Sequence, residues 1–154
     1  MDLFKKIIDV LDGANVPYEL KTHAPTVTSE DSARERGEPL KIGAKALLLK
    51  TDYQFVLCIL PANRKLDMTA IRARFDSRNL RFATIEELHK LTGCPKGAVP
   101  PFGHLFGIDM IVDEHLFAEE YMAFNAGQLD KSIKMKTADF RKTIEPVVTE
   151  FCTI

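Results

Sequence analysis

Cysteine is scarce in this sequence, and no two cysteines have the spacing of a pair. The 154-residue chain has three, Cys58, Cys94 and Cys152, and no C-x-x-C motif. An odd, sparse set of this kind is typical of reduced thiols in a cytoplasmic protein. Cys58 lies inside the apolar run "FVLCIL" and is expected in the core. Cys94 has a position that would suit a nucleophile, but no base lies near it in the sequence, so a packed thiol is the favoured interpretation.

Metal-binding and hydrolase motifs are also missing. The sequence has no H-E-x-x-H and no G-x-S-x-G, so neither a metal centre nor a serine hydrolase has a local motif behind it, and we expect no metal and no cofactor. The histidines do not pair at i, i+4. We expect His89 and His115 at the surface, whereas His104 adjoins a glycine–proline loop and is a candidate site residue.

Long apolar runs and a large net charge are absent too. The longest apolar stretch, around "ALLLK", is too short to span a bilayer, and the amino-terminal segment reads as a helix rather than a signal peptide, so no membrane partner is expected. The formal net charge is −1, which excludes nucleic-acid binding by bulk attraction, and no DNA partner is expected. A polyanion would have to be held by a local patch.

One segment, residues 64–81, has an excess of basic residues. Two acidic residues, Asp67 and Asp76, stand against six basic ones, so the local charge is six minus two, or +4. One interpretation is a solvated helix face, and the other is a footprint for a phosphodiester backbone. The basic residues are Arg64, Lys65, Arg72, Arg74, Arg78 and Arg81, of which the first four are the candidate contacts to such a backbone.

Five segments have helical signals and at least six have strand signals. The clearest helix is "TIEELHKLTG", where Thr84 and Glu87 have capping-box spacing and Gly93 follows as a stop. Other helices are expected at about 3–12, 28–37, 68–75 and 137–146. The runs "KALLLK" and "QFVLCIL" predict a buried hairpin, and "VPYELKTH", "GIDMIVD", "YMAFNA" and "KSIKMK" predict further strands. Residues 1–154 are therefore expected to form a single α+β domain, with a mixed, mainly antiparallel sheet or partial barrel surrounded by helices.

Two features could carry chemistry. The loop "GCPKGAVPPFG" at 93–103 has three glycines and three prolines. It could be a stiff crossing, or a wall of backbone N–H groups facing a ligand and stabilising an oxyanion. Lys45, at the start of an apolar strand, is either a solvated gatekeeper or a compact positive charge for a phosphate or an ester oxygen. A second glycine turn, "FNAGQ", contains Asn125 and Gly127.

The ordered set "GAKALLLK", "LPANRKLD", "TGCPKGAVPPFG", "VD" and "AFNAG…SI" resembles the YbaK family over about residues 20–136. This family includes the editing domain of bacterial prolyl-tRNA synthetases and its free-standing relatives. The resemblance implies a metal-independent hydrolase that acts in trans on the ester of a mischarged tRNA. It implies catalytic roles for Lys45, which would hold the 3′ adenosine or its phosphate, and for the loop residues Gly97, Ala98 and Val99. The substrate-binding residues that it implies are Pro100, Phe102, Gly103, Asn125, Gly127 and Ser132, to which His104 is added by its place beside the loop. With a tRNA substrate, Arg64, Lys65, Arg72 and Arg74 become the candidate tRNA contacts.

The resemblance leaves the removed amino acid open. Relatives that remove alanine from proline tRNA tend to have Asn straight after the lysine, where this chain has Ala46, and the segment after the second glycine turn is less basic than in relatives that clear cysteine. Alanine, cysteine, serine and threonine on proline tRNA all remain candidates. An aminoacyl-tRNA synthetase is a second expected partner. The alternatives are a non-catalytic tRNA- or synthetase-binding module, and hydrolysis of a small acyl ester unrelated to tRNA.

Overall fold

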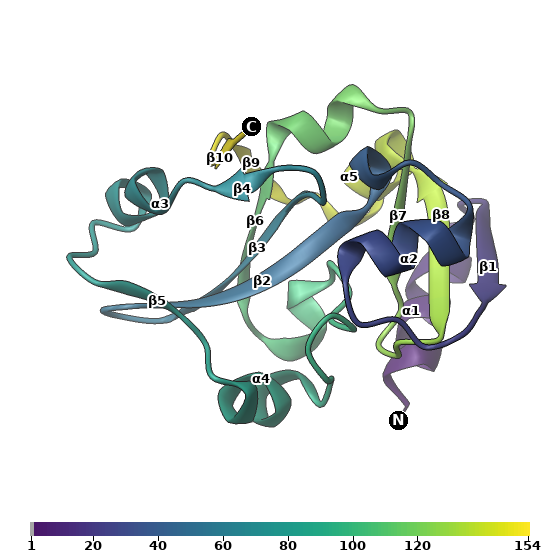
Figure 1. Cartoon of the computed structure of the whole chain (residues 1–154), viewed down its shortest axis with the longest axis horizontal. Helices are drawn as coiled ribbons and strands as arrows, with labels where there is room; N and C mark the ends of the chain where they lie inside the picture. Colours follow the sequence, from purple (N-terminus) through teal and green to yellow (C-terminus); the bar gives the residue numbers. More distant parts are fainter. Residues whose placement is uncertain (1) are drawn as a thin grey trace.

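A five-stranded sheet forms the centre of the computed structural model, which describes residues 2–154 (Figure 1). The strand order is β5-β2-β3-β6-β9. β2 and β3 are the predicted antiparallel hairpin, with Lys45 opposite Leu60. β6 is parallel to β3, and β9 is parallel to β6. The bounds are Ala44–Thr51 for β2, Phe55–Pro61 for β3, Leu80–Phe82 for β5, Asp109–Asp113 for β6 and Val147–Thr149 for β9.

Two smaller sheets complete the β structure. An antiparallel sheet has the order β1-β8-β7, and a short antiparallel ribbon joins β10 to β4. The expected α+β class with a mixed, mainly antiparallel sheet is thus confirmed. The bounds are Tyr18–Thr22 for β1, Lys65–Leu66 for β4, Tyr121–Asn125 for β7, Lys131–Lys136 for β8 and Cys152–Thr153 for β10.

Four of the five helices begin directly after the capping residues that the sequence predicts. Asp2, Thr28, Asp67 and Thr84 each accept a hydrogen bond from a backbone N–H of the helix that follows, and Thr84 forms the complete capping box with Glu87. The helices are α1 (Leu3–Gly13), α2 (Ser29–Arg36), α3 (Met68–Arg74), α4 (Ile85–Thr92) and α5 (Thr137–Ile144), with 3₁₀ turns at Leu40–Ile42, Gly103–Phe106 and Glu114–Ala118.

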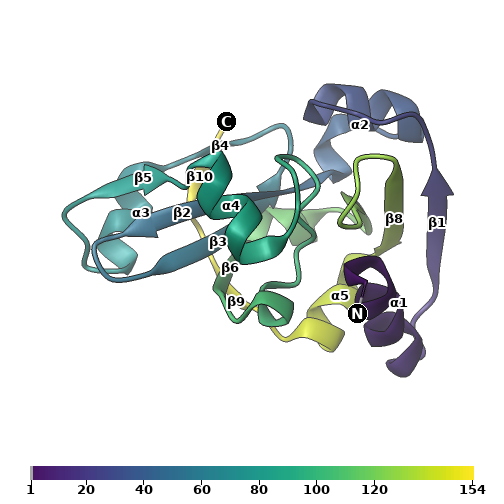
Figure 2. The same ribbon diagram turned by 90° about the horizontal axis from the view of Figure 1, so that it is seen from below.

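The two faces of the central sheet pack against different elements. Leu48, Leu57 and Ile59 face the main core, which also includes side chains of α1, α4 and α5. Leu49, Val56 and Cys58 face a smaller cluster with Ile71 of α3 and Phe151. The residues alternate because successive strand side chains point to opposite faces. Figure 2 shows α4 in front of the β2–β3 hairpin and α3 behind it.

A buried carboxylate ties the end of the chain to this sheet. Asp113 is fully buried, and its Oδ2 accepts the Phe151 N–H at 2.7 Å while Oδ1 accepts the His115 N–H at 2.8 Å and contacts its Nδ1 at 2.7 Å. Burial opposes ionisation, but these hydrogen bonds outweigh it and lower the pKa of Asp113. The expectation of a surface His115 was therefore wrong, because the ring is half-buried against this carboxylate.

In residues 2–154 no helix is long and apolar enough to cross a membrane.

Candidate functional site

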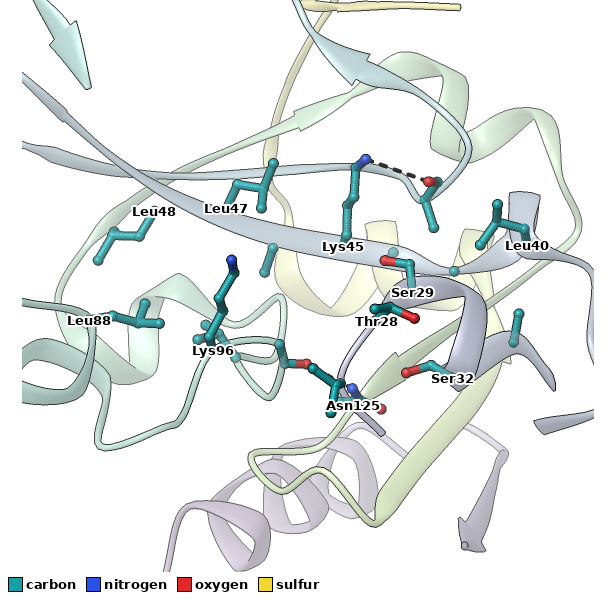
Figure 3. Close-up of a pocket in the computed structure, with 18 of the residues that line it drawn as sticks. Thr28, Ser29, Ser32, Leu40, Lys45, Leu47, Leu48, Leu88, Lys96 and Asn125 are labelled. Carbon is teal, nitrogen blue, oxygen red and sulfur yellow. Dashed lines mark hydrogen bonds between the residues drawn. The ribbon is translucent and has the colours of Figure 1, made fainter. Parts of the chain in front are cut away.

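A cavity of about 410 Å³ opens between α2, β2, α4 and the loop that follows α4 (Figure 3). Three large apolar side chains on its lining are exposed to solvent: Val27 at 80%, Phe82 at 54% and Ile85 at 70%. An exposed apolar cluster around a concave surface is typical of a ligand site. Shorter apolar side chains extend this surface: Ala33, Ala44, Ala46, Leu48, Leu88 and Val99.

Helix α2 presents one polar face to this cavity. Ser29, Ser32, Ala33 and Arg36 all line it, and their spacing of i, i+3, i+4 and i+7 places them on one side of a helix. The sequence reading treated this helix as a short polar segment and assigned it no site residue. This spacing is visible in the sequence and could have indicated a site. Polar side chains along one side of a helix usually face water, however, so the spacing alone does not predict a ligand site.

Strand β2 contributes an unpaired edge as well as side chains. β5 pairs with the carboxyl-terminal part of β2, from Leu49 onward. The hydrogen bond nearest the start of β2 is that from the Ala83 N–H to the Leu48 carbonyl, at 2.9 Å. The backbone groups of Ala46, two residues earlier, point the same way because strand geometry repeats every two residues. Ala46 therefore directs its N–H and C=O toward the cavity.

Lys45 lies on this edge, but its ammonium group does not face the loop after α4. Its Nζ is 2.5 Å from the Arg64 carbonyl oxygen and 3.5 Å from that of Ala62. Figure 3 shows the side chains of Lys45 and Leu47 on one side of β2, and those of Lys96 and Leu88 on the other. Both groups belong to the lining of the same cavity. The cavity thus has one region near the ammonium group of Lys45 and another near the loop, with the β2 edge between them.

The loop offers two backbone donors to the cavity. Of its seven residues Gly97–Gly103, Pro100 and Pro101 have no N–H. In the described part of the chain, the N–H groups of Gly97 and Val99 have no acceptor, and both residues line the cavity. The other three have partners: Ala98 with the Pro95 carbonyl at 3.1 Å, Phe102 with the Pro100 carbonyl at 2.8 Å and Gly103 with Met110 Sδ at 3.4 Å. The expected wall of N–H groups is therefore narrower than the sequence reading assumed.

The second glycine turn holds the loop from behind. The Asn125 side chain donates from Nδ2 to the Gly97 carbonyl at 2.7 Å, and the Gly127 N–H donates to the Ala98 carbonyl at 2.9 Å. Both Gly97 and Gly127 have positive φ, +89° and +83°, which glycine adopts without strain. The loop and the turn, which are about 28 residues apart in the chain, thus form one unit.

The charges on the cavity lining all have the same sign. Arg36, Lys45 and Lys96 line it, and no carboxylate of residues 2–154 does. Burial lowers the pKa of Arg36 to about 10, and burial also lowers the pKa of Lys45, against an opposing contribution from Glu30. A cavity of this kind favours an anionic ligand such as a phosphodiester.

Several expected substrate-binding residues lie outside the cavity lining. Phe102 is fully buried among Phe124 and Phe140, with ring centroids 5.5 and 6.2 Å away. Gly103 packs closely against the Ile108 carbonyl, and a Cβ there would lie 2.7 Å from that oxygen. Ser132 is buried behind Asn125, Pro100 is buried, and His104 is exposed; none of these residues lines the cavity. Their effect on a ligand would be indirect, through the shape of the loop.

The expected tRNA contacts continue from the Lys45 region toward α3. Arg64 provides the carbonyl that holds Lys45, Lys65 follows in β4, and Arg72 and Arg74 lie on α3. None of these four has an ion-pair partner among the residues described here. Arg81, in contrast, is paired with Glu87 at 2.7 and 3.0 Å.

The cysteines are not placed for nucleophilic chemistry at this cavity. Cys58 and Cys94 are buried, as expected, and burial raises the pKa of Cys58 to about 12. Cys152 lies 3.8 Å from His115 Nδ1, away from the cavity lining. Burial, together with Asp113, raises its pKa to about 12. None of the three thiols offers a ready thiolate to a ligand in the cavity.

Comparisons with known proteins identify the family of this chain. The chain is 33% identical over 152 residues to the multifunctional Ser/Thr-tRNA deacylase ProXp-y of Escherichia coli (strain K12), which covers 96% of this chain and 91% of that protein. It is 25% identical over 151 residues to the prolyl-tRNA editing protein ProX of Acetoanaerobium sticklandii, covering 94% and 92%. The solved structure of a candidate trans-editing enzyme for prolyl-tRNA synthetase shares the fold, with a TM-score of 0.84, 20% identity and coverage of 100% and 99%. Residues 23–143 match the family model described as the aminoacyl-tRNA editing domain, and the chain belongs to this family.

Proposed function

We propose that this chain is a trans-editing aminoacyl-tRNA deacylase that hydrolyses the ester of a mischarged tRNA. The observation that carries the proposal is the cavity itself, which, among residues 2–154, combines three cations, no lining carboxylate and two unpaired loop N–H groups. Family membership and the names of the two curated relatives support the same activity. A tRNA 3′ end provides both the phosphodiester that suits the cations and the ester carbonyl that suits the N–H groups.

The proposed mechanism depends on backbone donors rather than on acid–base side chains. The ester carbonyl lies against the loop, where the N–H groups of Gly97 and Val99 stabilise the oxyanion of the tetrahedral intermediate. Lys45 holds the terminal phosphate or adenosine on the other side of the β2 edge. Water attacks the carbonyl, the bond to the ribose oxygen breaks, and the neighbouring ribose hydroxyl assists proton transfer. An activated ester requires positioning and oxyanion stabilisation more than a strong nucleophile.

The amino acid that we propose is serine or threonine, on proline tRNA or another tRNA. The relative named a Ser/Thr-tRNA deacylase supports this choice. So do the hydroxyl groups of Thr28, Ser29 and Ser32 on the lining, because a site that hydrogen-bonds a substrate hydroxyl discriminates against substrates without one. Alanine and cysteine lack that hydroxyl and are expected to be poorer substrates. An aminoacyl-tRNA synthetase is a further proposed partner, and the cytoplasm is the proposed location.

The test is deacylation of a panel of tRNAs charged with serine, threonine, alanine or cysteine, alongside the correctly charged tRNAs. We expect release of serine and threonine in multiple turnovers without added metal, and unchanged rates in the presence of a chelator. Binding of tRNA without release of any amino acid would replace the proposal with a non-catalytic binding module. Hydrolysis of small aminoacyl esters at the same rate as of aminoacyl-tRNA would show that the tRNA is not the substrate.

A further inference from the structure

We propose that Arg36, which no motif singled out, is a positioning residue that acts through Asn125 to fix the Gly97–Ala98 peptide, which lies between the two free loop N–H groups. The kinetic part of this inference rests on the proposed function, whereas its structural part does not. Arg36 is the last residue of α2, and its guanidinium extends from that helix to the second glycine turn.

Arg36 determines which way the Asn125 amide points. Its Nη2 lies 3.0 Å from Asn125 Oδ1, and its Nε lies 2.9 Å from Ser132 Oγ. A guanidinium has only donors, so the atom facing it must be the amide oxygen. The Asn125 Nδ2 then faces the Gly97 carbonyl, to which it donates at 2.7 Å. An amide turned by 180° would place two donors against each other on one side and two acceptors on the other.

Ser132 does not replace Arg36 in this role. His23 Nδ1 is 2.8 Å from the Ala24 carbonyl, which only accepts, so this nitrogen carries the proton. Its other ring nitrogen, Nε2, lies 2.7 Å from Ser132 Oγ, so the single Ser132 hydroxyl proton serves either this short contact or the one to Asn125. The contact from Ser132 to Asn125 Oδ1 is longer, at 3.2 Å. Arg36 therefore gives Asn125 Oδ1 the shorter and charge-assisted hydrogen bond of the two.

The fixed amide sets the orientation of the loop peptides. In a trans peptide the C=O and the following N–H point in opposite directions. The Gly97–Ala98 peptide is held at both ends, by Asn125 Nδ2 on its carbonyl and by the Pro95 carbonyl on its N–H. The next peptide has its carbonyl on the Gly127 N–H, so the Val99 N–H points the opposite way, away from the glycine turn. Removing Arg36 leaves only the longer Ser132 contact on Asn125 Oδ1, so the Gly97–Ala98 peptide loses its fixed orientation and the adjoining peptide, held by Gly127, loses a fixed neighbour.

A direct role would look different. Nη1 is the Arg36 nitrogen for which the described residues provide no hydrogen bond, and Arg36 lines the cavity. If Arg36 served as a phosphate ligand through Nη1, its loss would weaken substrate binding and reduce the salt dependence. If it positions the loop, its loss lowers kcat, because oxyanion donors act on the transition state.

The test compares Arg36→Met and Arg36→Lys with Arg34→Met. Arg34 is on the same helix and pairs with Asp31 at the surface, so its loss controls for charge and helix composition. For both Arg36 variants we expect kcat about 10- to 100-fold lower and KM within about threefold of the wild type, which is the size of losing one or two charged hydrogen bonds. Lysine keeps the charge but cannot contact Asn125 and Ser132 together, so Arg36→Lys should resemble Arg36→Met. Asn125→Ala added to Arg36→Met should cost much less than it does alone.

Hydrogen exchange followed by NMR gives a readout that does not require activity. The N–H groups of Ala98 and Gly127, both hydrogen-bonded, should exchange at least about tenfold faster in Arg36→Met and be unchanged in Arg34→Met. An unchanged loop exchange, or a raised KM with an unchanged kcat, would overturn the proposal. If the wild-type protein deacylated no tRNA, the proposed function would fail while exchange at Ala98 and Gly127 still decided the role of Arg36.

Discussion

Replacing Lys45 by alanine should change how salt affects substrate binding. Within the described part of the chain, the Lys45 ammonium donates to two neutral carbonyl oxygens, those of Ala62 and Arg64, and forms no ion pair, so its charge is available to a phosphate. For a single-stranded 3′ end, each phosphate neutralised by a cation contributes about 0.7 to the slope of log affinity against log salt. Raising the salt fourfold, from about 50 to 200 mM, should then reduce the wild-type advantage over Lys45→Ala by about 2.6-fold, which is four to the power of 0.7.

The assay is fluorescence anisotropy with a labelled tRNA acceptor minihelix that carries a non-hydrolysable aminoacyl 3′ end. Lys50→Ala is the matched control, because Lys50 lies on the same strand and its Nζ also contacts a carbonyl, that of Thr51 at 2.8 Å, but it is not part of the cavity lining. We expect its salt slope to equal that of the wild type. A wild-type to Lys45→Ala affinity ratio that is constant across this salt range would refute the reasoning, and so would an equal effect of Lys50→Ala.

Four further predictions follow from particular residues. Gly103→Ala, whose Cβ would lie 2.7 Å from a backbone carbonyl, should lower the free energy of unfolding by about 1–3 kcal/mol. The Cβ of Gly97→Ala would meet no atom closer than 3.7 Å, but the backbone there has φ +89°. This variant should therefore lower the free energy of unfolding by about 1–2 kcal/mol and also lower kcat. Urea unfolding and steady-state deacylation measure the two effects, and an unaffected kcat would contradict the role of the loop. Asp113→Asn should lose about 1–3 kcal/mol at neutral pH. Because the folded pKa of Asp113 is lowered, the wild-type advantage is complete above about pH 4 and disappears as the pH falls through the folded pKa; equal stability of the two proteins at pH 7 would refute this. Arg72→Ala with Arg74→Ala should weaken tRNA binding and reduce its salt slope by about 0.9 per lost phosphate contact to a duplex, and an unchanged slope would remove α3 from the interface.

Local signals predicted most of the fold. The capping residues Thr84 and Glu87 gave the start of α4, and the alternation around Leu48 gave the buried hairpin. The parallel pairing of β3 with β6 and of β6 with β9 was not predictable in the same way, because it depends on contacts between segments far apart in the chain. The short strands β4 and β10 were missed for a different reason, because two residues are too few to show a periodic pattern.

The candidate site was predicted only in part. The sequence indicated Lys45, the loop and Asn125, and these do belong to one cavity or to its supporting wall. Strand alternation also predicts that the Lys45 side chain points away from the face shared by Ala44 and Ala46. The sequence does not say on which of these two faces the loop lies, so the position of Lys45 relative to the loop could not be predicted. That only two of the loop's N–H groups are free among the described residues could be seen only once the hydrogen-bond partner of each N–H was known in three dimensions. Arg36 was missed because its partners lie about 90 residues away.

The free N–H groups of Gly97 and Val99 have an evolutionary consequence. A catalytic histidine or serine is lost with its side chain, whereas a main-chain N–H is removed only by a change to proline and is otherwise displaced at particular positions such as Gly97. Substitutions of the surrounding side chains, such as Ala44 or Ser29, can therefore alter which amino acid is accepted while the backbone donors for ester hydrolysis are retained. A lineage built in this way would be expected to diversify in selectivity far more readily than it loses turnover.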